Sequence, residues 1–164
     1  MKIITIIILL IVTLLICQCK KSKKEHSHFP RDFAFKYKTD AYTYNSRTQL
    51  YTRQYSDSTA SLKVSLTEKE LQSIFNDIQE FEFMNFPEEF ECEKEGTFTV
   101  PSFTSSIVVT FNKQVKQSTN NTICTRKTRQ TDSNNFFLMQ EKIYRILSSK
   151  KEVQTLPRTD ILYM

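Results

Sequence analysis

The stretch LTEKELQSIFNDIQEF, residues 66–81, predicts an amphipathic helix with a marked start. Thr67 and Glu70 have the spacing of a capping box, in which the Thr hydroxyl accepts from the amide three residues on and the Glu carboxylate reaches back. The apolar residues after this start recur at helical spacing on one face: Leu71, Ile74, Phe75, Ile78 and Phe81. Such a face must be covered, so the flanking sequence is expected to supply the rest of a core.

The sequence before this helix alternates between apolar and polar residues with a period of two, which is typical of half-buried strands. Phe33, Phe35 and Tyr37 show it first. Residues 45–48 are turn-forming and separate two further alternating runs, which predicts a hairpin. The expected strands are residues 33–37, the hairpin arms 42–44 and 50–55, and residues 62–66.

After Pro87 the pattern returns to strands and then to a helix. Residues 103–111 alternate, Asn112-Lys113 is a possible tight turn, and residues 114–118 would pair back before a polar loop at 119–131. Asp132 or Ser133 is expected to cap a second helix, with a Glu141–Arg145 pair on its polar side. Its apolar face would consist of Phe136, Met139, Ile143, Ile146 and Leu147, and residues 161–163 could add a short last strand.

This order of elements predicts one α+β domain over residues 32–164. We expect an antiparallel sheet of five to six strands with the two amphipathic helices packed on one face. The single glycine, Gly96, excludes a P-loop or a dinucleotide-binding fingerprint, because both need several glycines.

Most of the net charge of +5 belongs to the first 25 residues. From position 26 onward the chain has 18 basic and 17 acidic residues, so its basicity does not indicate nucleic-acid binding. Both histidines, His26 and His28, precede the predicted domain. No Ser-His-Asp or Cys-His catalytic site is therefore expected inside it, and we predict a protein that is not an enzyme and has no cofactor.

The N-terminus predicts export. Lys2 precedes 14 predominantly apolar residues, 3–16, which is short for a membrane span and suitable for a signal peptide. Cys19 followed by two lysines resembles the lipobox region of Bacteroidota-type lipoproteins, in which a peptidase cuts before a lipidated cysteine. Gln18 stands where that family usually has a small residue, and Cys17 is the alternative acceptor.

The resemblance implies a signal peptide at 1–18 and a lipidated basic tether at 19–31. Because lysines and not acidic residues follow Cys19, it also implies attachment to the outer membrane facing the periplasm. An uncleaved signal-anchor is the alternative. A metal site at Cys17, Cys19, His26 and His28 is not favoured, since lipidation and cleavage would remove the thiols.

Cys92 and Cys124 are the only cysteines in the predicted domain, and in an exported protein they are expected to form a disulfide. Closing that loop would stabilise the fold by about 3–4 kcal/mol. The alternating acids at Glu89, Glu91, Glu93 and Glu95 are interpreted as a solvated loop, because a calcium loop needs a geometry that this sequence lacks.

Four tyrosines in the predicted hairpin form a candidate binding surface: Tyr42, Tyr44, Tyr51 and Tyr55. If their faces coincide, the phenols could stack on a sugar or a peptide. The alternative is cross-strand packing that only stiffens the hairpin. We therefore expect a lipid-anchored, non-catalytic binding module of the cell envelope with an envelope protein as a possible partner. A small periplasmic hydrolase or ligand-sequestering protein that uses carboxylates is the alternative.

Overall fold

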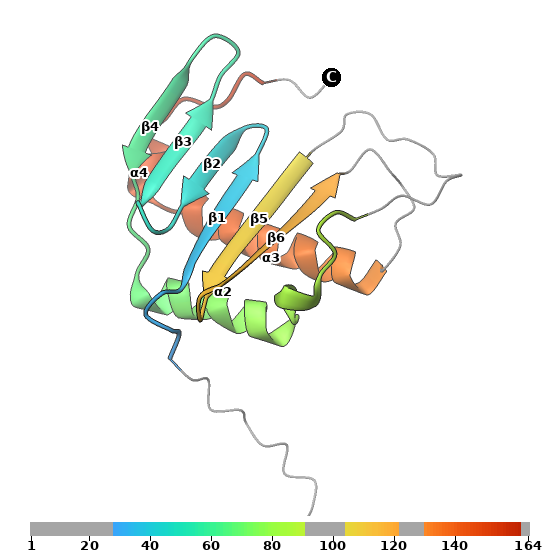
Figure 1. Ribbon diagram of the computed structural model, residues 1–164. Helices are drawn as coiled ribbons and strands as arrows, with labels where there is room; N and C mark the ends of the chain where they lie inside the picture. Colours follow the sequence, from blue (N-terminus) through green and yellow to red (C-terminus); the bar gives the residue numbers. More distant parts are fainter. Residues whose placement is uncertain (1–27, 91–103, 122–129, 162–164) are drawn as a thin grey trace, which may run out of the picture.

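The computed structural model describes residues 28–90, 104–121 and 130–161, and these form an α+β fold (Figure 1). The predicted fold class is confirmed: one antiparallel sheet of six strands with helices against it. The strands are β1 (Ala34–Thr39), β2 (Tyr42–Asn45), β3 (Leu50–Gln54), β4 (Thr59–Lys63), β5 (Thr104–Phe111) and β6 (Gln114–Asn121). The helices are α2 (Glu68–Glu80), the 3-10 turn η1 (Phe83–Asn85), α3 (Gln130–Ser148) and α4 (Lys151–Gln154).

The sheet has the strand order β4-β3-β2-β1-β5-β6, so β1 lies near its middle. Tyr37 of β1 stands opposite Tyr44 of β2 and Ile107 of β5. Because side chains alternate between the two faces of a strand, this register places all three on the same face. All three are buried, which identifies that face as the core side of the sheet.

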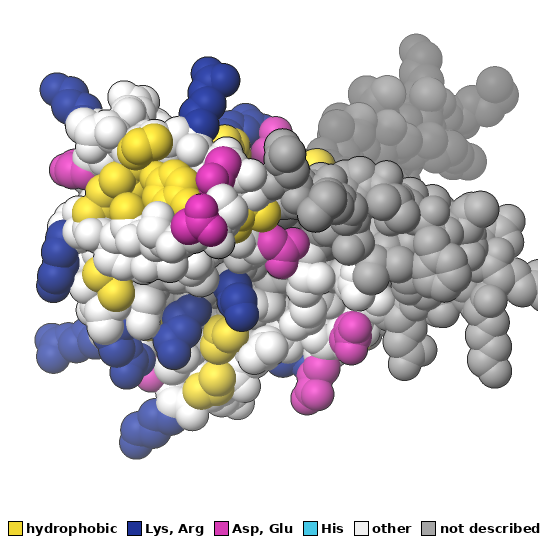
Figure 2. Space-filling model, turned by 90° about the horizontal axis from the view of Figure 1, so that it is seen from above, with side chains coloured by type: hydrophobic (Ala, Val, Ile, Leu, Met, Phe, Trp, Pro, Cys, Tyr) yellow, Lys and Arg dark blue, Asp and Glu magenta, His cyan; other side chains and the backbone are white. Residues whose placement is uncertain are grey.

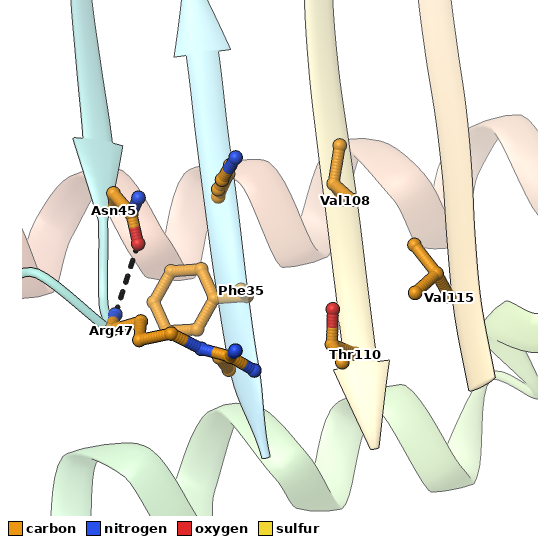
Figure 3. Close-up of a pocket in the computed structure, with 8 residues that line it drawn as sticks. Phe35, Asn45, Arg47, Val108, Thr110 and Val115 are labelled. Carbon is orange, nitrogen blue, oxygen red and sulfur yellow. Dashed lines mark hydrogen bonds between the residues drawn. The ribbon is translucent and has the colours of Figure 1, made fainter. Parts of the chain in front are cut away.

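Both long helices cover this one face (Figures 1 and 3). The capping box at the start of α2 is formed as predicted: Thr67 Oγ1 accepts from the Glu70 amide, and the Thr67 amide donates to Glu70 Oε2 at 2.7 Å. The apolar stripes of α2 and α3 pack into the core. The buried members of the two stripes are Ile74, Phe75, Ile78, Phe136, Met139, Ile143 and Leu147.

Aromatic rings fill much of the core. Phe75 meets Phe33 and Phe111 at centroid distances of 5.0 and 5.5 Å, both edge-on. Phe90 meets Phe136 in the same way at 5.5 Å. Rings in this arrangement bring the positive edge of one against the negative face of another, which is a favourable contact. The large aromatic side chains therefore supply much of the buried apolar surface that aliphatic residues would otherwise provide.

The turn between β5 and β6 is a two-residue hairpin with left-handed backbone. Asn112 and Lys113 have φ of 49° and 62°. The carboxylate of Asp32 accepts from both of their amides, at 3.0 and 2.8 Å. These two hydrogen bonds lower the pKa of Asp32, because they favour its ionised form.

Several boundaries differ from the sequence-based expectation. Strand β6 continues to Asn121, because its polar second half pairs along the full length of β5. Helix α3 begins at Gln130, ahead of the expected caps at Asp132 and Ser133, and η1 and α4 were not predicted. Ile161 is not in a strand, and residues 162–163 lie outside the described part of the chain.

Residues before position 32 also contact the core. Phe29 packs against the core, and its amide donates to Gln72 Oε1 of α2 at 3.2 Å. The last residues of the segment expected to be tether therefore contact the folded domain. Within the described residues, no helix is both long enough and apolar enough to cross a bilayer.

Candidate functional site

A pocket of about 450 Å³ opens on the core side of the sheet, between β2, β3, α3 and the segment after α4. Its described lining residues are Ala41, Tyr42, Tyr51, Arg53, Tyr144, Arg158 and Thr159. Figure 2 views the molecule from above and shows hydrophobic side chains gathered between basic and acidic ones. The volume lies in the range of small-ligand sites. We call this feature the tyrosine–arginine pocket.

Tyr42 is the centre of an aromatic cluster in the pocket. Its ring stacks on Tyr51 at 5.8 Å with 20° between the planes. The Tyr42 ring also contacts the ring of Tyr144 of α3, with the centroids 5.9 Å apart, and the ring of the buried Tyr37, edge-on, with the centroids 5.5 Å apart. The strands supply three of these four rings and the helix supplies Tyr144, which is 50% exposed and forms the outer wall.

Arg53 joins the aromatic cluster to the C-terminal segment. Its Nε and Nη2 donate to the hydroxyl of Tyr51 at 3.4 and 3.2 Å, and its guanidinium lies 5.7 Å from the centroid of that ring. Its Nη1 donates to the carbonyls of Leu156 and Pro157 at 3.1 and 2.6 Å. The guanidinium is thus held rigidly by neutral acceptors, which leaves its charge uncompensated.

The pocket is positively charged. Among the described residues, neither Arg53 nor Arg158 makes an ion pair, and none of the described lining residues is acidic. The nearby carboxylate of Asp160 accepts instead from the Ser56 amide and hydroxyl, at 2.9 and 2.6 Å. An anionic group entering the pocket would meet two guanidiniums that have no carboxylate partner of their own.

Two phenols of the pocket, those of Tyr42 and Tyr51, stay neutral at physiological pH. Burial, followed by the neighbouring Tyr37 hydroxyl, raises the pKa of Tyr42 far above its ordinary value. Burial also raises the pKa of Tyr51, against the opposing effect of Arg53. A neutral phenol can donate a hydrogen bond and adds no negative charge, so both tyrosines are compatible with an anionic ligand.

The structure divides the predicted tyrosine surface. Tyr44 and Tyr51 are 1% and 3% exposed, so they are core residues and do not present an open platform. Their register on β2 and β3 directs them to the face that the helices cover. Tyr42 and Tyr55 are half-buried, and the Tyr55 hydroxyl donates to the carbonyl of Pro157 at 3.1 Å. Of the four, Tyr42 and Tyr51 line the pocket.

Five of the seven lining residues were not predicted from the sequence, and three of these supply the charge and the outer ring of the pocket: Arg53, Tyr144 and Arg158. Arg53 carried a usable signal, since it lies two positions after Tyr51 and therefore on the same face of the strand. Tyr144 was also visible as an aromatic residue off the apolar stripe of its helix. Arg158 follows the last helix in an irregular segment. Such a segment has no sequence periodicity from which the position of a side chain could be predicted.

Three other hollows lie in the described part of the chain; the smallest, about 350 Å³, is lined by His28, Glu68 and their neighbours, and the other two compete with this pocket. One of about 530 Å³ lies between α2 and α3, and three carboxylates line it. Each is in an ion pair: Asp77 with Lys142 at 2.6 Å, Glu70 with Lys150 at 2.6 Å, and Glu141 with Arg145 at 2.8 Å. The other hollow, about 400 Å³, lies on the open side of the sheet (Figure 3).

The remaining predicted sites lie outside the described residues. This applies to the lipidation candidates Cys19 and Cys17 and to the expected Cys92–Cys124 disulfide. Within the residues that the structure describes, no group of three or more His, Cys, Asp or Glu side chains is arranged to hold a metal ion.

No protein-family model matches this chain, and no curated protein matches it. Its function must therefore be inferred from the chemistry of the tyrosine–arginine pocket and from the sequence of its first residues.

Proposed function

We propose that this protein is a lipid-anchored binding module of the cell envelope, and that its tyrosine–arginine pocket binds an acidic peptide segment of an envelope partner protein. The observation that carries the proposal is the combination of two partly exposed phenol rings, Tyr42 and Tyr144, with two guanidiniums that have no acidic partner among the described residues. Aromatic rings offer flat contact area for a peptide, and arginine pairs with carboxylates through parallel hydrogen bonds.

The proposed attachment is through a lipid on Cys19, with Cys17 as the alternative acceptor and the domain facing the periplasm. It rests on the apolar run at residues 3–16 and on the lysines that follow Cys19. Intact mass of the membrane-extracted protein tests it: residues 1–18 should be absent and a diacylglycerol adduct present. An unprocessed N-terminus would contradict lipidation and support the signal-anchor alternative.

Binding is preferred over catalysis because of how the described carboxylates are used. A carboxylate hydrolase needs two acids that can act on a substrate, one of them free to donate a proton. The three carboxylates that line the groove between α2 and α3 are instead held by lysine or arginine. No geometry among the described residues favours the hydrolase.

The binding proposal is tested with the peptide N-acetyl-Glu-Ser-Glu amide and its neutral counterpart N-acetyl-Gln-Ser-Gln amide. Calorimetric titration of the detergent-solubilised full chain should show binding of the glutamate peptide alone. Arg158→Gln should weaken that binding about tenfold, since a hydrogen bond to a charged group contributes about 1.5 kcal/mol or more. Tyr144→Leu should weaken it through loss of ring contact.

Two substitutions on the same protein serve as matched controls. Arg31→Gln removes an exposed arginine outside the pocket, and Phe137→Leu removes an exposed ring from the helix that carries Tyr144. Both should leave the affinity unchanged. Equal binding of the two peptides, or equal losses in the pocket variants and the controls, would contradict the proposal.

A further inference from the structure

The face of the sheet opposite the helices is open, and the charged side chains of the six strands are all basic. None of the six strands of the described chain contains an aspartate or glutamate. Lys36, Lys38 and Lys63 all project from the open face and are exposed. Among the described residues, none of the three makes an ion pair. In Figure 2 this face is the lower side of the view, where Lys and Arg side chains project at the left.

The lysines are spread across the face by the strand register. Residues that stand opposite one another form a continuous row across all six strands: Lys63, Leu50, Asn45, Lys36, Val108 and Gln117. Lys63 and Lys36 are three strands apart in this row, or about 14 Å at the usual strand spacing. A second row contains Lys38 among Thr and Ser residues. The result is a broad cationic surface with hydroxyl groups between the charges.

The hollow on this face could accommodate a small anionic group. It has a volume of about 400 Å³, with the cations of Lys36 and Arg47 and the hydroxyl of Thr110 in its lining. Figure 3 shows the side chain of Arg47 extending toward β1 and that of Val115 at the opposite side of the hollow. Two cations and a hydroxyl donor around one hollow suit a phosphate oxygen.

The opposite side of the molecule differs in its electrostatics. The exposed surfaces of α2 and α3 carry both signs of charge, arranged in pairs such as Asp77–Lys142 and Glu141–Arg145. An extended anionic surface would therefore be attracted to the open sheet face more strongly than to the helices. With the sheet face so engaged, the tyrosine–arginine pocket on the helix side stays accessible.

We propose that the open sheet face rests on the anionic lipid headgroups of the membrane that holds the N-terminus, with a headgroup phosphate in the hollow lined by Lys36 and Arg47. The proposal rests on the membrane attachment proposed above, because the anchor keeps the domain close to the bilayer. Each lysine near an anionic membrane surface is attracted to it weakly. The attractions of the three lysines of the open face and of the lysines of the predicted tether are additive. The orientation should therefore weaken as salt is raised.

Exposed apolar residues on both sides of the molecule report the orientation. Leu50 and Val115 are 41% and 68% exposed and belong to the open face, whereas Phe137 and Tyr144 are 56% and 50% exposed on α3. The membrane-extracted full chain is reconstituted into vesicles of phosphatidylcholine alone or mixed with phosphatidylglycerol. Hydroxyl-radical oxidation of the four side chains is then measured by mass spectrometry.

Anionic vesicles should reduce oxidation of Leu50 and Val115 about threefold relative to neutral vesicles, with Phe137 and Tyr144 little changed. Lys36→Gln combined with Lys38→Gln and Lys63→Gln should abolish this protection. The control combination Lys69→Gln, Lys116→Gln and Lys151→Gln removes the same number of charges from the helix side. This variant should keep the protection of Leu50 and Val115. High salt should remove the protection from the unaltered protein.

Identical oxidation in the two kinds of vesicle would overturn the proposal, as would protection of the helix-side residues or equal effects of the two lysine combinations. Failure of the anchor is distinguishable, because an unanchored chain would separate from the neutral vesicles on flotation. A chain that floats with both vesicles and shows no difference in oxidation contradicts only the proposed orientation.

Discussion

Tyr44 carries a hydroxyl group into the core and finds one acceptor there. Its side chain is 1% exposed, and the hydroxyl donates to the carbonyl of Val64 at 2.9 Å. Burial, with the negative charge of Glu70 second, raises the pKa of this phenol to about 12. A tyrosine of an unfolded chain titrates near pH 10, so the two states bind protons differently in between.

The first prediction concerns this difference. Because the folded pKa is raised, Tyr44 contributes stability that is complete below about pH 10 and is lost as the pH rises toward about 12. The free energy of unfolding should therefore fall over this range, and Tyr44→Phe should reduce the slope. Urea unfolding at a series of pH values measures it.

Tyr144→Phe is the matched control, since it removes an exposed phenol from the same protein. A Tyr44→Phe curve that falls as steeply as that of the control would contradict the assignment of the slope to the buried phenol.

At the scale of elements, the β5–β6 hairpin is formed by residues that do not favour its turn. Two-residue hairpins require positive φ and usually contain glycine, whereas this turn has Asn112 and Lys113. A left-handed backbone costs about 1–2 kcal/mol for a residue with a Cβ. The two amide hydrogen bonds to Asp32 offset part of that cost.

The second prediction follows from this cost. Lys113→Gly should stabilise the protein by about 1 kcal/mol, because glycine adopts positive φ without the Cβ clash. Thermal unfolding monitored by circular dichroism should show a higher midpoint. In Lys116→Gly the same change falls inside a strand and should destabilise by about 0.5–1 kcal/mol. A lowered midpoint for Lys113→Gly would contradict the account of the turn.

Elements that depend on local sequence agreed best with expectation. The capping box of α2 and the pairing of Glu141 with Arg145 involve residues three or four positions apart, so the sequence alone was sufficient. The end of β6 was misplaced because it depends on a distant partner strand. Asn121 is in a strand only because Thr104 stands opposite it.

At the scale of the whole molecule, the segment after α4 returns to the far end of the hairpin. The Thr159 hydroxyl donates to the carbonyl of Gln54 at 2.7 Å, and Asp160 accepts from Ser56. Arg53 holds the carbonyls of Leu156 and Pro157 on the same side. Contacts across more than 100 residues thus complete one wall of the tyrosine–arginine pocket.

The third prediction is that Arg53→Lys loosens this wall. A lysine ammonium cannot reproduce the planar fork that reaches both carbonyls and the Tyr51 hydroxyl. Amide hydrogen exchange of residues 159–161 should accelerate about tenfold, since a lost charge-assisted hydrogen bond costs about 1.5 kcal/mol or more. Arg47→Lys, on the open side of the sheet, should leave that exchange unchanged. Unchanged exchange in Arg53→Lys would show that other contacts hold the segment.

Periodicity and spacings of a few residues were sufficient to predict the fold class, the two helical stripes and the hairpin of tyrosines. The sequence by itself did not determine which tyrosines are buried, since that depends on which face of the sheet the helices cover. Only the tertiary structure brought Tyr42, Tyr144 and Arg158 to one pocket. These residues lie far apart in the chain, and they come together through the packing of the whole core. Local sequence patterns contain no information about that packing.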